Sequence, residues 1–292
     1  MPLVTTAELV SAAAARGHGI GAFNVITLEH AEAIAEGAER VGAPAILQIS
    51  ENAVRFHGGR LGAVAAATAA VARAASVPLA LHLDHVESAE LLRAAPAEGF
   101  SSVMFDASKL PYAENLKATA EAVRWGHDHG VWVEAELGAV GGKEGDGADG
   151  GGPALDAHTP GVRTDPAEAA VFVAETGVDA LAVAVGSSHA MTRRTAALDH
   201  ALVAALREAV PVPLVLHGSS GVPDEEIRRA VAAGMVKVNV GTALNTACTE
   251  AVRAHLAGHP ATVDPRKYLA PAREAMAGTV AGFLRVVSSP QA

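Results

Sequence analysis

The sequence predicts a single (β/α)8 barrel, and three observations lead to this class. The chain has 292 residues, close to the roughly 250 that one closed α/β barrel uses. Short apolar runs alternate with Ala-rich segments at helical spacing, which is typical of repeated strand–helix units. Eight such runs can be counted, each continuously apolar, as expected of parallel strands covered on both faces. We therefore expect residues 1–292 to form one domain.

The eight expected strands are separated by segments long enough for a crossover helix. In chain order they are GIGAFNV (19–25), APAILQIS (43–50), VPLALHLDH (77–85), SSVMFDAS (101–108), VWVEAELG (131–138), ALAVAVGS (180–187), PLVLHGS (213–219) and MVKVNVGT (235–242).

Two regions lie outside this repeat. The Gly-rich stretch at about 138–163 cannot form a helix or a strand, so it is expected to be a long mobile loop over the active site. After the eighth strand, residues 243–260 and about 264–288 have helical character. The last of these helices runs beyond what barrel closure needs and could cover or join a neighbouring molecule.

The composition excludes several classes of function. A formal net charge of −10, only 22 Lys and Arg, and 3% aromatic residues argue against nucleic-acid binding. No apolar run approaches the 18 or so residues of a membrane span, and no signal peptide is visible, so we expect a cytoplasmic protein. The single cysteine, Cys248, excludes an intrachain disulfide and a Cys-rich zinc module. Any metal must therefore bind His, Asp or Glu.

Polar residues gather at the carboxyl ends of the expected strands. In a barrel these ends meet on one face, where the active site is built. The residues are Asn24, Ser50, Asp84, His85, Asp106, Glu136, His217 and Asn239, with His189 just after the sixth strand.

Three of these residues, His85, His189 and His217, match the ligand set of a catalytic zinc, which has three protein ligands and one open position. Asp106 and Glu136 could add oxygen ligands. The alternative is a polar barrel mouth without metal. His82 and Glu134 lie two residues before Asp84 and Glu136 on the same strand faces, where they either support the metal ligands or are polar residues of the barrel interior.

A phosphate site is predicted after strands seven and eight. LHGSSG (216–221) and KVNVGT (237–242) place small residues at strand ends, where backbone N–H groups can approach an anion. Each could also be an ordinary turn. The candidate residues are Gly218, Ser219, Ser220, Asn239, Gly241 and Thr242.

The sequence resembles the class II, metal-dependent ketose-bisphosphate aldolases over essentially its whole length. The resemblance rests on motifs in a fixed order at seven strands and in the tail. They are FNV (23–25), HLDH (82–85), SSVMFDAS (101–108), VEAELG with GGKE (133–138, 141–144), AVGSSH (184–189), LHGSSG (216–221), KVNVGT (237–242) and DPRKYL (264–269).

The resemblance implies a role for each matching residue. His85, His189 and His217 would bind one catalytic Zn²⁺ per chain, and Asp106 and Glu136 would belong to a second divalent metal site. A monovalent cation could also bind.

Asp84 would transfer the proton at the C4 oxygen, and Glu144 the proton at C3 of dihydroxyacetone phosphate. Asn24, Ser50, Ala190, Val240 and the phosphate candidates would contact the substrate. Arg266 would reach into a neighbouring subunit, which implies a homodimer or homotetramer.

The sequence departs from the family pattern around the substrate. The usual His-Gly is His189-Ala190, Arg193 and Arg194 follow near the mouth, and Ala243 replaces a frequent acidic residue. The expected reaction is zinc-dependent cleavage of fructose 1,6-bisphosphate to dihydroxyacetone phosphate and glyceraldehyde 3-phosphate. Tagatose 1,6-bisphosphate or another phosphorylated ketose is the alternative.

Three other functions stay open on the residues alone. The first is a metal-dependent barrel hydrolase or isomerase, although such a hydrolase would not need two phosphate cradles. The second is an aldolase that forms an imine on Lys237, which lies in the eighth expected strand. The third is a binding protein without catalytic activity.

Overall fold

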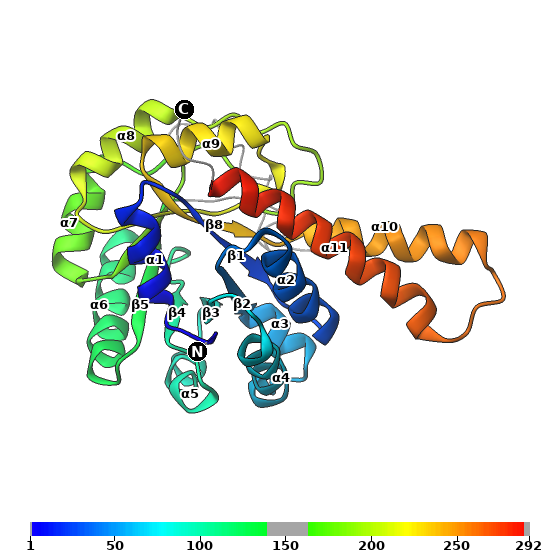
Figure 1. The fold of residues 1–292 in the computed structure, drawn as a ribbon. Coiled ribbons are helices and arrows are strands. Elements are labelled where there is room, and N and C mark those ends of the chain that lie inside the picture. Colours follow the sequence, from blue (N-terminus) through cyan, green and yellow to red (C-terminus); the bar gives the residue numbers. More distant parts are fainter. Residues whose placement is uncertain (1, 139–162, 289–292) are drawn as a thin grey trace.

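Eight parallel strands close into a barrel in the computed structural model, which describes residues 2–138 and 163–288 (Figure 1). Each strand pairs with the next, and β8 pairs with β1. The strands are β1 (Ile20–Asn24), β2 (Ala45–Ser50), β3 (Leu79–Val86), β4 (Ser102–Phe105), β5 (Trp132–Leu137), β6 (Ala180–Val183), β7 (Leu214–Leu216) and β8 (Met235–Val240).

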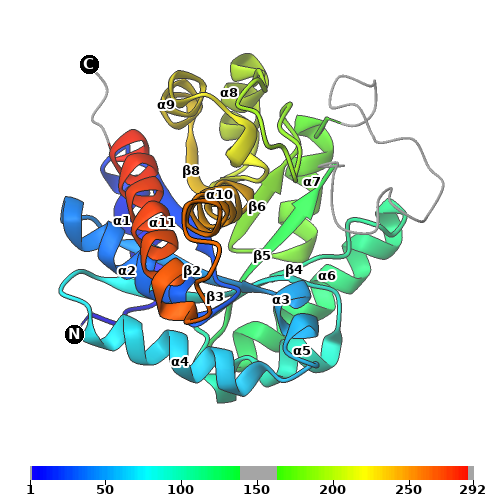
Figure 2. The same cartoon turned by 90° about the vertical axis from the view of Figure 1, so that its right-hand side faces the viewer.

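Helices follow the strands and form an outer layer around the barrel (Figure 2). They are α1 (Thr6–Ala15), α2 (Leu28–Val41), α3 (Glu51–Phe56), α4 (Leu61–Ala74), α5 (Ala89–Ala94), α6 (Tyr112–Asp128), α7 (Pro166–Thr176), α8 (His200–Ala209), α9 (Asp224–Ala233), α10 (Thr242–Gly258) and α11 (Pro265–Val287), with 3₁₀ turns at Pro96–Glu98 and Ser219–Gly221.

The predicted barrel and the two C-terminal helices are confirmed. Six of the predicted strands end too late, most clearly β4, β6 and β7, where three or four residues of each predicted segment lie beyond the strand; β2 ends where predicted, and β3 ends one residue later than predicted. These trailing residues are the small and polar ones that leave the sheet to build the mouth of the barrel. The predicted loop lies almost wholly in residues 139–162, outside the described residues.

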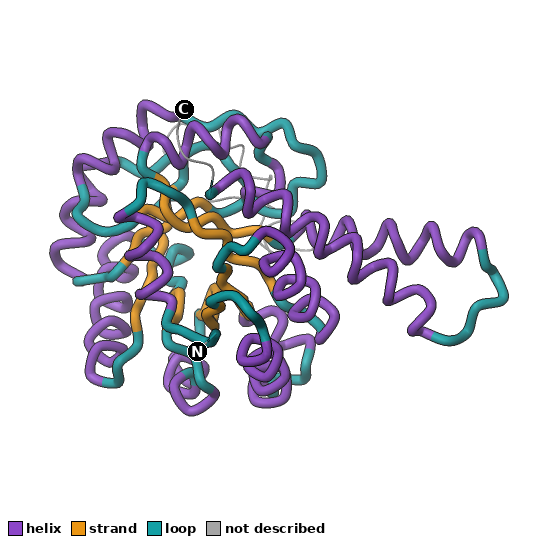
Figure 3. The backbone as a smooth tube through the Cα atoms, viewed as in Figure 1, coloured by secondary structure: helices purple, strands orange, loops and turns teal. Residues whose placement is uncertain are grey.

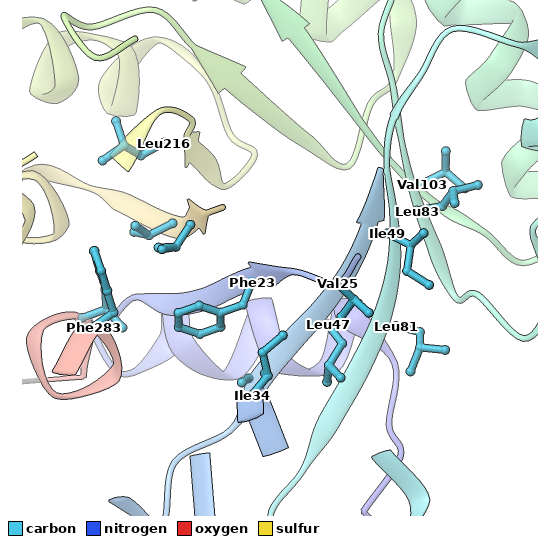
Figure 4. Packing of buried hydrophobic residues seen from close by; sticks show 14 of the residues in the cluster. Phe23, Val25, Ile34, Leu47, Ile49, Leu81, Leu83, Val103, Leu216 and Phe283 are labelled. Atoms are coloured by element: carbon cyan, nitrogen blue, oxygen red, sulfur yellow. The ribbon is translucent and has the colours of Figure 1, made fainter. Parts of the chain in front are cut away.

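Two apolar layers hold the barrel together, because alternate residues of each strand face opposite sides. In the layer between strands and helices, Phe23 and Leu47 lie beside Ile34 of α2, whereas Leu83 lies beside Val103 of β4 (Figure 4). Inside the barrel, a smaller cluster that includes Ile46 fills the end where the strands begin, and α1 covers it. The other end of the interior is lined by polar residues.

The two C-terminal helices form an arm that extends from the barrel. α10 and α11 form a hairpin that projects away from the barrel, and the second half of α11 returns to pack on α2 (Figure 3). Helices α2 and α11 touch at Gly37 of α2, where an added Cβ would lie 2.7 Å from the carbonyl oxygen of Ala277 in α11. At the turn of the arm Val263 is 91% exposed.

Among the described residues, no helix combines the length and the apolar character that crossing a bilayer requires.

Candidate metal and substrate site

The end of β3 places two adjacent functional residues in the same cavity. In a regular strand Asp84 and His85 would face opposite sides. The pairing of β3 with β4 is irregular between Leu83 and Val86, and His85 has a positive φ of 47°. This local distortion is costly for a residue other than glycine, and such conformations concentrate at functional sites. It turns His85 toward the mouth of the barrel beside Asp84.

The structure brings four potential metal ligands together. His85, Glu136, His189 and His217 each offer a ligand atom, and these atoms all lie within 4.8 Å of one another. The imidazole of His85 lies edge-to-face with the other two, at centroid distances of 5.1 Å to His189 and 4.8 Å to His217. His85 and Glu136 come from β3 and β5, whereas His189 and His217 lie in the segments after β6 and β7, so the cluster exists only in the closed barrel.

Carboxylates hold two of the imidazoles. His85 donates from Nδ1 to Asp106 at 2.8 Å, which leaves Nε2 for a metal. His217 donates from Nε2 to Glu134 at 3.1 Å, and its Nδ1 lies 3.0 Å from Glu136. Imidazole ligands oriented by carboxylates are typical of zinc sites. The donor set of three imidazoles and one carboxylate therefore fits Zn²⁺.

The pKa of His217 reflects this acidic surrounding. Burial alone would lower it, but hydrogen bonds to Glu134 and Glu136 outweigh burial and raise the pKa to about 9. In the metal-free protein His217 is therefore a cation between two carboxylates. A bound metal would displace the proton on Nδ1.

A second layer of buried charge supports His217 from below. Lys237 of β8 is 0% exposed, and its Nζ lies 2.8 Å from Oε2 of Glu134. Burial raises the pKa of Glu134, but the lowering by Lys237 and His217 is larger, so its pKa lies far below the usual range. Glu134 is therefore an anion that bridges Lys237 and His217. Buried and ion-paired in this way, Lys237 is not placed to form an imine with a ligand in the cavity.

Asp84 is a buried carboxylate at the edge of the histidine cluster. It is 1% exposed, Oδ2 accepts a hydrogen bond of 3.3 Å from Gln48, and Oδ1 has no hydrogen-bond partner within residues 2–138 and 163–288. Burial raises the pKa of Asp84, but nearby His85 and Lys237 outweigh burial, so the pKa lies below its usual value. Asp84 is thus an anion at neutral pH, with one oxygen available to accept a proton.

His82 lies beneath Asp84 and is neutral. Burial, followed by the charge of Lys237, lowers the pKa of His82 to about 3. Its Nδ1 is 2.7 Å from the hydroxyl of Ser102, and its Nε2 is 4.0 Å from Asp84. His82 and Glu134 therefore support different groups. Glu134 is hydrogen-bonded to His217, whereas His82 lies next to Asp84 in the barrel interior.

A cavity of about 560 Å³ opens above these groups. Its wall includes the side of the barrel formed by the loops after β7 and β8, where α10 begins at Thr242. The N–H groups at the start of a helix bind anions. Most of the predicted substrate residues line the cavity, namely Asn24, Ser50, Ala190, Gly218, Ser220, Asn239, Gly241 and Thr242.

Three predicted residues do not line the cavity, and a fourth is not described by the structure. Ser219 and Val240 are buried and do not line the cavity, and the hydroxyl of Ser219 donates to the carbonyl of Asn239. Arg266 lies at the start of α11 on the arm, with 88% of its side chain exposed and an ion pair to Asp264. Glu144 lies outside the described residues.

Ala190 has an uncommon backbone conformation. It follows His189 with a φ of 58°, it is exposed, and its methyl group borders the cavity. A positive φ is energetically unfavourable for any residue with a Cβ, because the Cβ crowds the backbone carbonyl oxygen. Ala190 therefore narrows the cavity where a glycine would leave room.

Sequence reasoning missed Gln48, which donates to both Asn24 and Asp84 and so orients the carboxylate. The available signal was a polar residue two positions before Ser50, on the same face of an otherwise apolar strand. It also missed Arg55 and Lys109, which line the cavity from loops and a short helix. No periodic pattern marks such positions.

Comparisons with known proteins agree with this geometry. Residues 4–291 match the family model described as fructose-bisphosphate aldolase class-II. The fructose-bisphosphate aldolase of Geobacillus stearothermophilus is 40% identical over 290 residues, which cover 99% of this chain and 98% of the relative. That of Thermus caldophilus is 39% identical over 310 aligned positions, which cover 98% of each.

A solved structure extends the agreement to three dimensions. The crystal structure of the YdjI aldolase from Escherichia coli K12 superposes with a TM-score of 0.82 and 30% identity, covering 98% of this chain and 97% of the other. The match to the family model spans nearly the whole chain, and the relatives are covered almost completely. The chain belongs to the class II fructose-bisphosphate aldolase family and is a carbon–carbon lyase.

Proposed function

We propose that this protein cleaves fructose 1,6-bisphosphate reversibly into dihydroxyacetone phosphate and glyceraldehyde 3-phosphate. The observation that carries the proposal is the position of Asp84, a buried anion beside the histidine cluster and in the same cavity as a helix N-terminus suited to phosphate. The choice of fructose 1,6-bisphosphate as the substrate rests on the names of the relatives, which are fructose-bisphosphate aldolases.

His85, His189 and His217 would hold the catalytic zinc, with Glu136 close enough to be a fourth ligand. When bound, a divalent cation acts as a Lewis acid that polarises the C2 ketone, an effect of several kcal/mol. Asp106 and Glu136 remain the candidates for a second metal position. Asp106 contributes in either case, because it fixes the ring of His85.

Asp84 is suited to start the cleavage. Its free oxygen accepts the proton of the C4 hydroxyl, the C3–C4 bond breaks, and C4 becomes the aldehyde carbon. The electron pair of the broken bond passes to C3, next to the polarised ketone. In the proposal Glu144 then donates a proton to C3, which releases dihydroxyacetone phosphate. Condensation uses the same steps in reverse.

The phosphate on the ketone side would bind where the loops after β7 and β8 meet. Thr242 begins α10, a helix of 17 residues, and Ser220 accepts a hydrogen bond of 3.0 Å from the N–H of Ala243. Gly218 is required here, because an added Cβ would lie 2.5 Å from the carbonyl oxygen of Ser188. Backbone donors and small side chains thus form a compact anion site.

Retro-aldol assays test the function. We expect the wild-type protein to release both triose phosphates from fructose 1,6-bisphosphate, and faster than from tagatose 1,6-bisphosphate. Asp84→Ala should abolish cleavage yet keep proton exchange at C3 of dihydroxyacetone phosphate, whereas Glu144→Ala should suppress that exchange. Equal loss of both activities in both variants would contradict the assignment. A wild-type protein that cleaves neither bisphosphate would contradict the function.

The arm suggests that the protein assembles with itself. Of the 17 residues of α10, only Leu244 is buried, and Leu256 and Val263 are exposed large apolar residues near its far end. We infer that a second copy of the chain covers the arm, as a homodimer or a tetramer of dimers. Arg266, which projects from this arm, would then reach the site of the neighbouring chain.

The mass in solution and a mixing experiment test this assembly. Light scattering should give a mass of at least two chains at micromolar concentration. Arg266→Ala and Asp84→Ala chains, mixed after gentle dissociation, should recover part of the cleavage activity if each site takes residues from two chains. A monomer, or no recovery in verified mixed dimers, would refute the role of Arg266.

A further inference from the structure

The cavity has a second polar wall opposite the ketone-side phosphate site. Because the strands follow in order around the closed ring, the loops after β7 and β8 lie across the barrel from those after β3 and β4. The far wall comes from α3 and from the loops after β3 and β4. Its residues include Glu51, Asn52, Arg55, Phe56, Glu87 and Lys109.

Only two of the described residues that line the cavity are arginine or lysine, and both lie on this far wall. They are Arg55 and Lys109. Arg194 does not line the cavity, because its guanidinium binds the carbonyl of Val222 and the carboxylate of Asp224. Within one chain, therefore, a negative group at this end of a ligand would meet Arg55 and Lys109 first.

Arg55 is anchored but retains donors for a ligand. Its Nη2 donates to Glu51 at 2.6 Å and its Nη1 to Asn52 at 3.0 Å. A guanidinium has five N–H donors, and these two bonds use two of them. The side chain is half-exposed at the cavity wall, so the remaining edge can be reached.

Glu51 fixes this arrangement. Its second carboxylate oxygen accepts hydrogen bonds from the backbone N–H groups of Glu87 and Ser88, at 2.8 and 3.1 Å. Lys109 in turn pairs with Glu87 at 2.9 Å. A chain of contacts thus joins both cations to the end of β3. Pre-ordered cations of this kind lose little freedom when they bind an anion.

We propose that Arg55 binds the phosphate of the aldehyde half of the substrate from within the same chain, with Lys109 in a supporting role. The inference rests on the proposed function, since a bisphosphate must place its second phosphate away from the ketone-side site. Bidentate binding by a guanidinium gives charge-assisted hydrogen bonds, and loss of such a contact weakens binding by about ten- to a hundredfold. Arg266 of a neighbouring chain could complete the same site.

Two substrates separate this role from a general one. We expect Arg55→Ala to raise KM for fructose 1,6-bisphosphate at least tenfold and to change kcat/KM for fructose 1-phosphate less than twofold, because the latter has no second phosphate. Arg55→Lys keeps the charge without the bidentate geometry and should lose less. Arg228→Ala, an exposed arginine of α9, is the control and should match the wild type for both substrates.

Equal effects of Arg55→Ala on both substrates, or no effect on the bisphosphate, would overturn the inference. Binding measured by calorimetry in an Asp84→Asn background makes the same comparison without turnover. There, Arg55→Ala should remove the preference for the bisphosphate over the 1-phosphate. If the wild type cleaves neither substrate, the proposed function fails, whereas the calorimetric comparison still decides the role of Arg55.

Discussion

His217→Ala is expected to remove both the metal and the activity. The imidazole contributes one of three histidine ligands, and nothing else among the described residues is placed to replace it between Glu134 and Glu136. Zinc left with fewer ligands binds weakly and in the wrong geometry. The Lewis-acid effect of several kcal/mol is lost with it, so cleavage should fall by about 10³-fold or more.

Metal content and rate should be measured together on dialysed protein. His200→Ala is a matched control, because His200 also pairs with a carboxylate, Glu226 at 2.9 Å, but lies outside the cluster. It should retain about one zinc per chain and nearly full activity. A His217→Ala protein that keeps stoichiometric zinc, or a wild-type protein that is fully active after chelation, would rule out the zinc assignment.

Lys237→Met is expected to destabilise the fold more than any surface change. It removes one of the two cationic partners of the Glu134 carboxylate in the barrel interior, where Lys237 and Glu134 are both 0% exposed. The partner that is left, the imidazolium of His217, is also shared with Glu136. Removing one partner of a buried ion pair typically costs about 3–5 kcal/mol, since the remaining charge stays desolvated. Urea unfolding of the metal-free protein should show this loss in the free energy of unfolding.

A double variant separates the missing charge from the missing volume. Lys237→Met with Glu134→Gln removes both charges and should be more stable than Lys237→Met alone. Arg228→Met, which breaks an exposed pair with Glu225, should change the free energy of unfolding by less than about 0.5 kcal/mol. A cost below about 1 kcal/mol for Lys237→Met, or simple additivity in the double variant, would contradict this account.

The sequence was sufficient for the architecture because the relevant signal is local. Each strand is a short apolar run, and each run ends in a polar residue that becomes part of one mouth once the ring closes. That rule predicts that His85, His189 and His217 lie near the same mouth, whereas the turn of the His85 side chain into the cavity depends on the distortion at the end of β3. Their identity as zinc ligands remains a prediction that the geometry favours.

Other features could not be read from the sequence, because they depend on conformation. The distortion at His85 needs the register of β3 against β4, which no residue type announces. The link between Lys237 and Glu134 joins β8 to β5, and alternation predicts only that both face the interior. Arg55 lies in a helix of six residues whose orientation is set by Glu51 and the backbone after β3.

The closure of the ring between its first and last strands also governs how the chain folds. β1 pairs with a second strand only once β8 has formed. The N–H of Gly19 likewise finds its acceptor, the carbonyl of Val287 at 2.8 Å, only when the C-terminal helix has docked. During synthesis, β1 therefore presents an open edge for nearly the whole length of the chain. Such edges invite pairing with other chains, and contacts this distant in sequence form slowly. Shortening the C-terminal helix is therefore expected to lower the yield of folded protein as well as its stability.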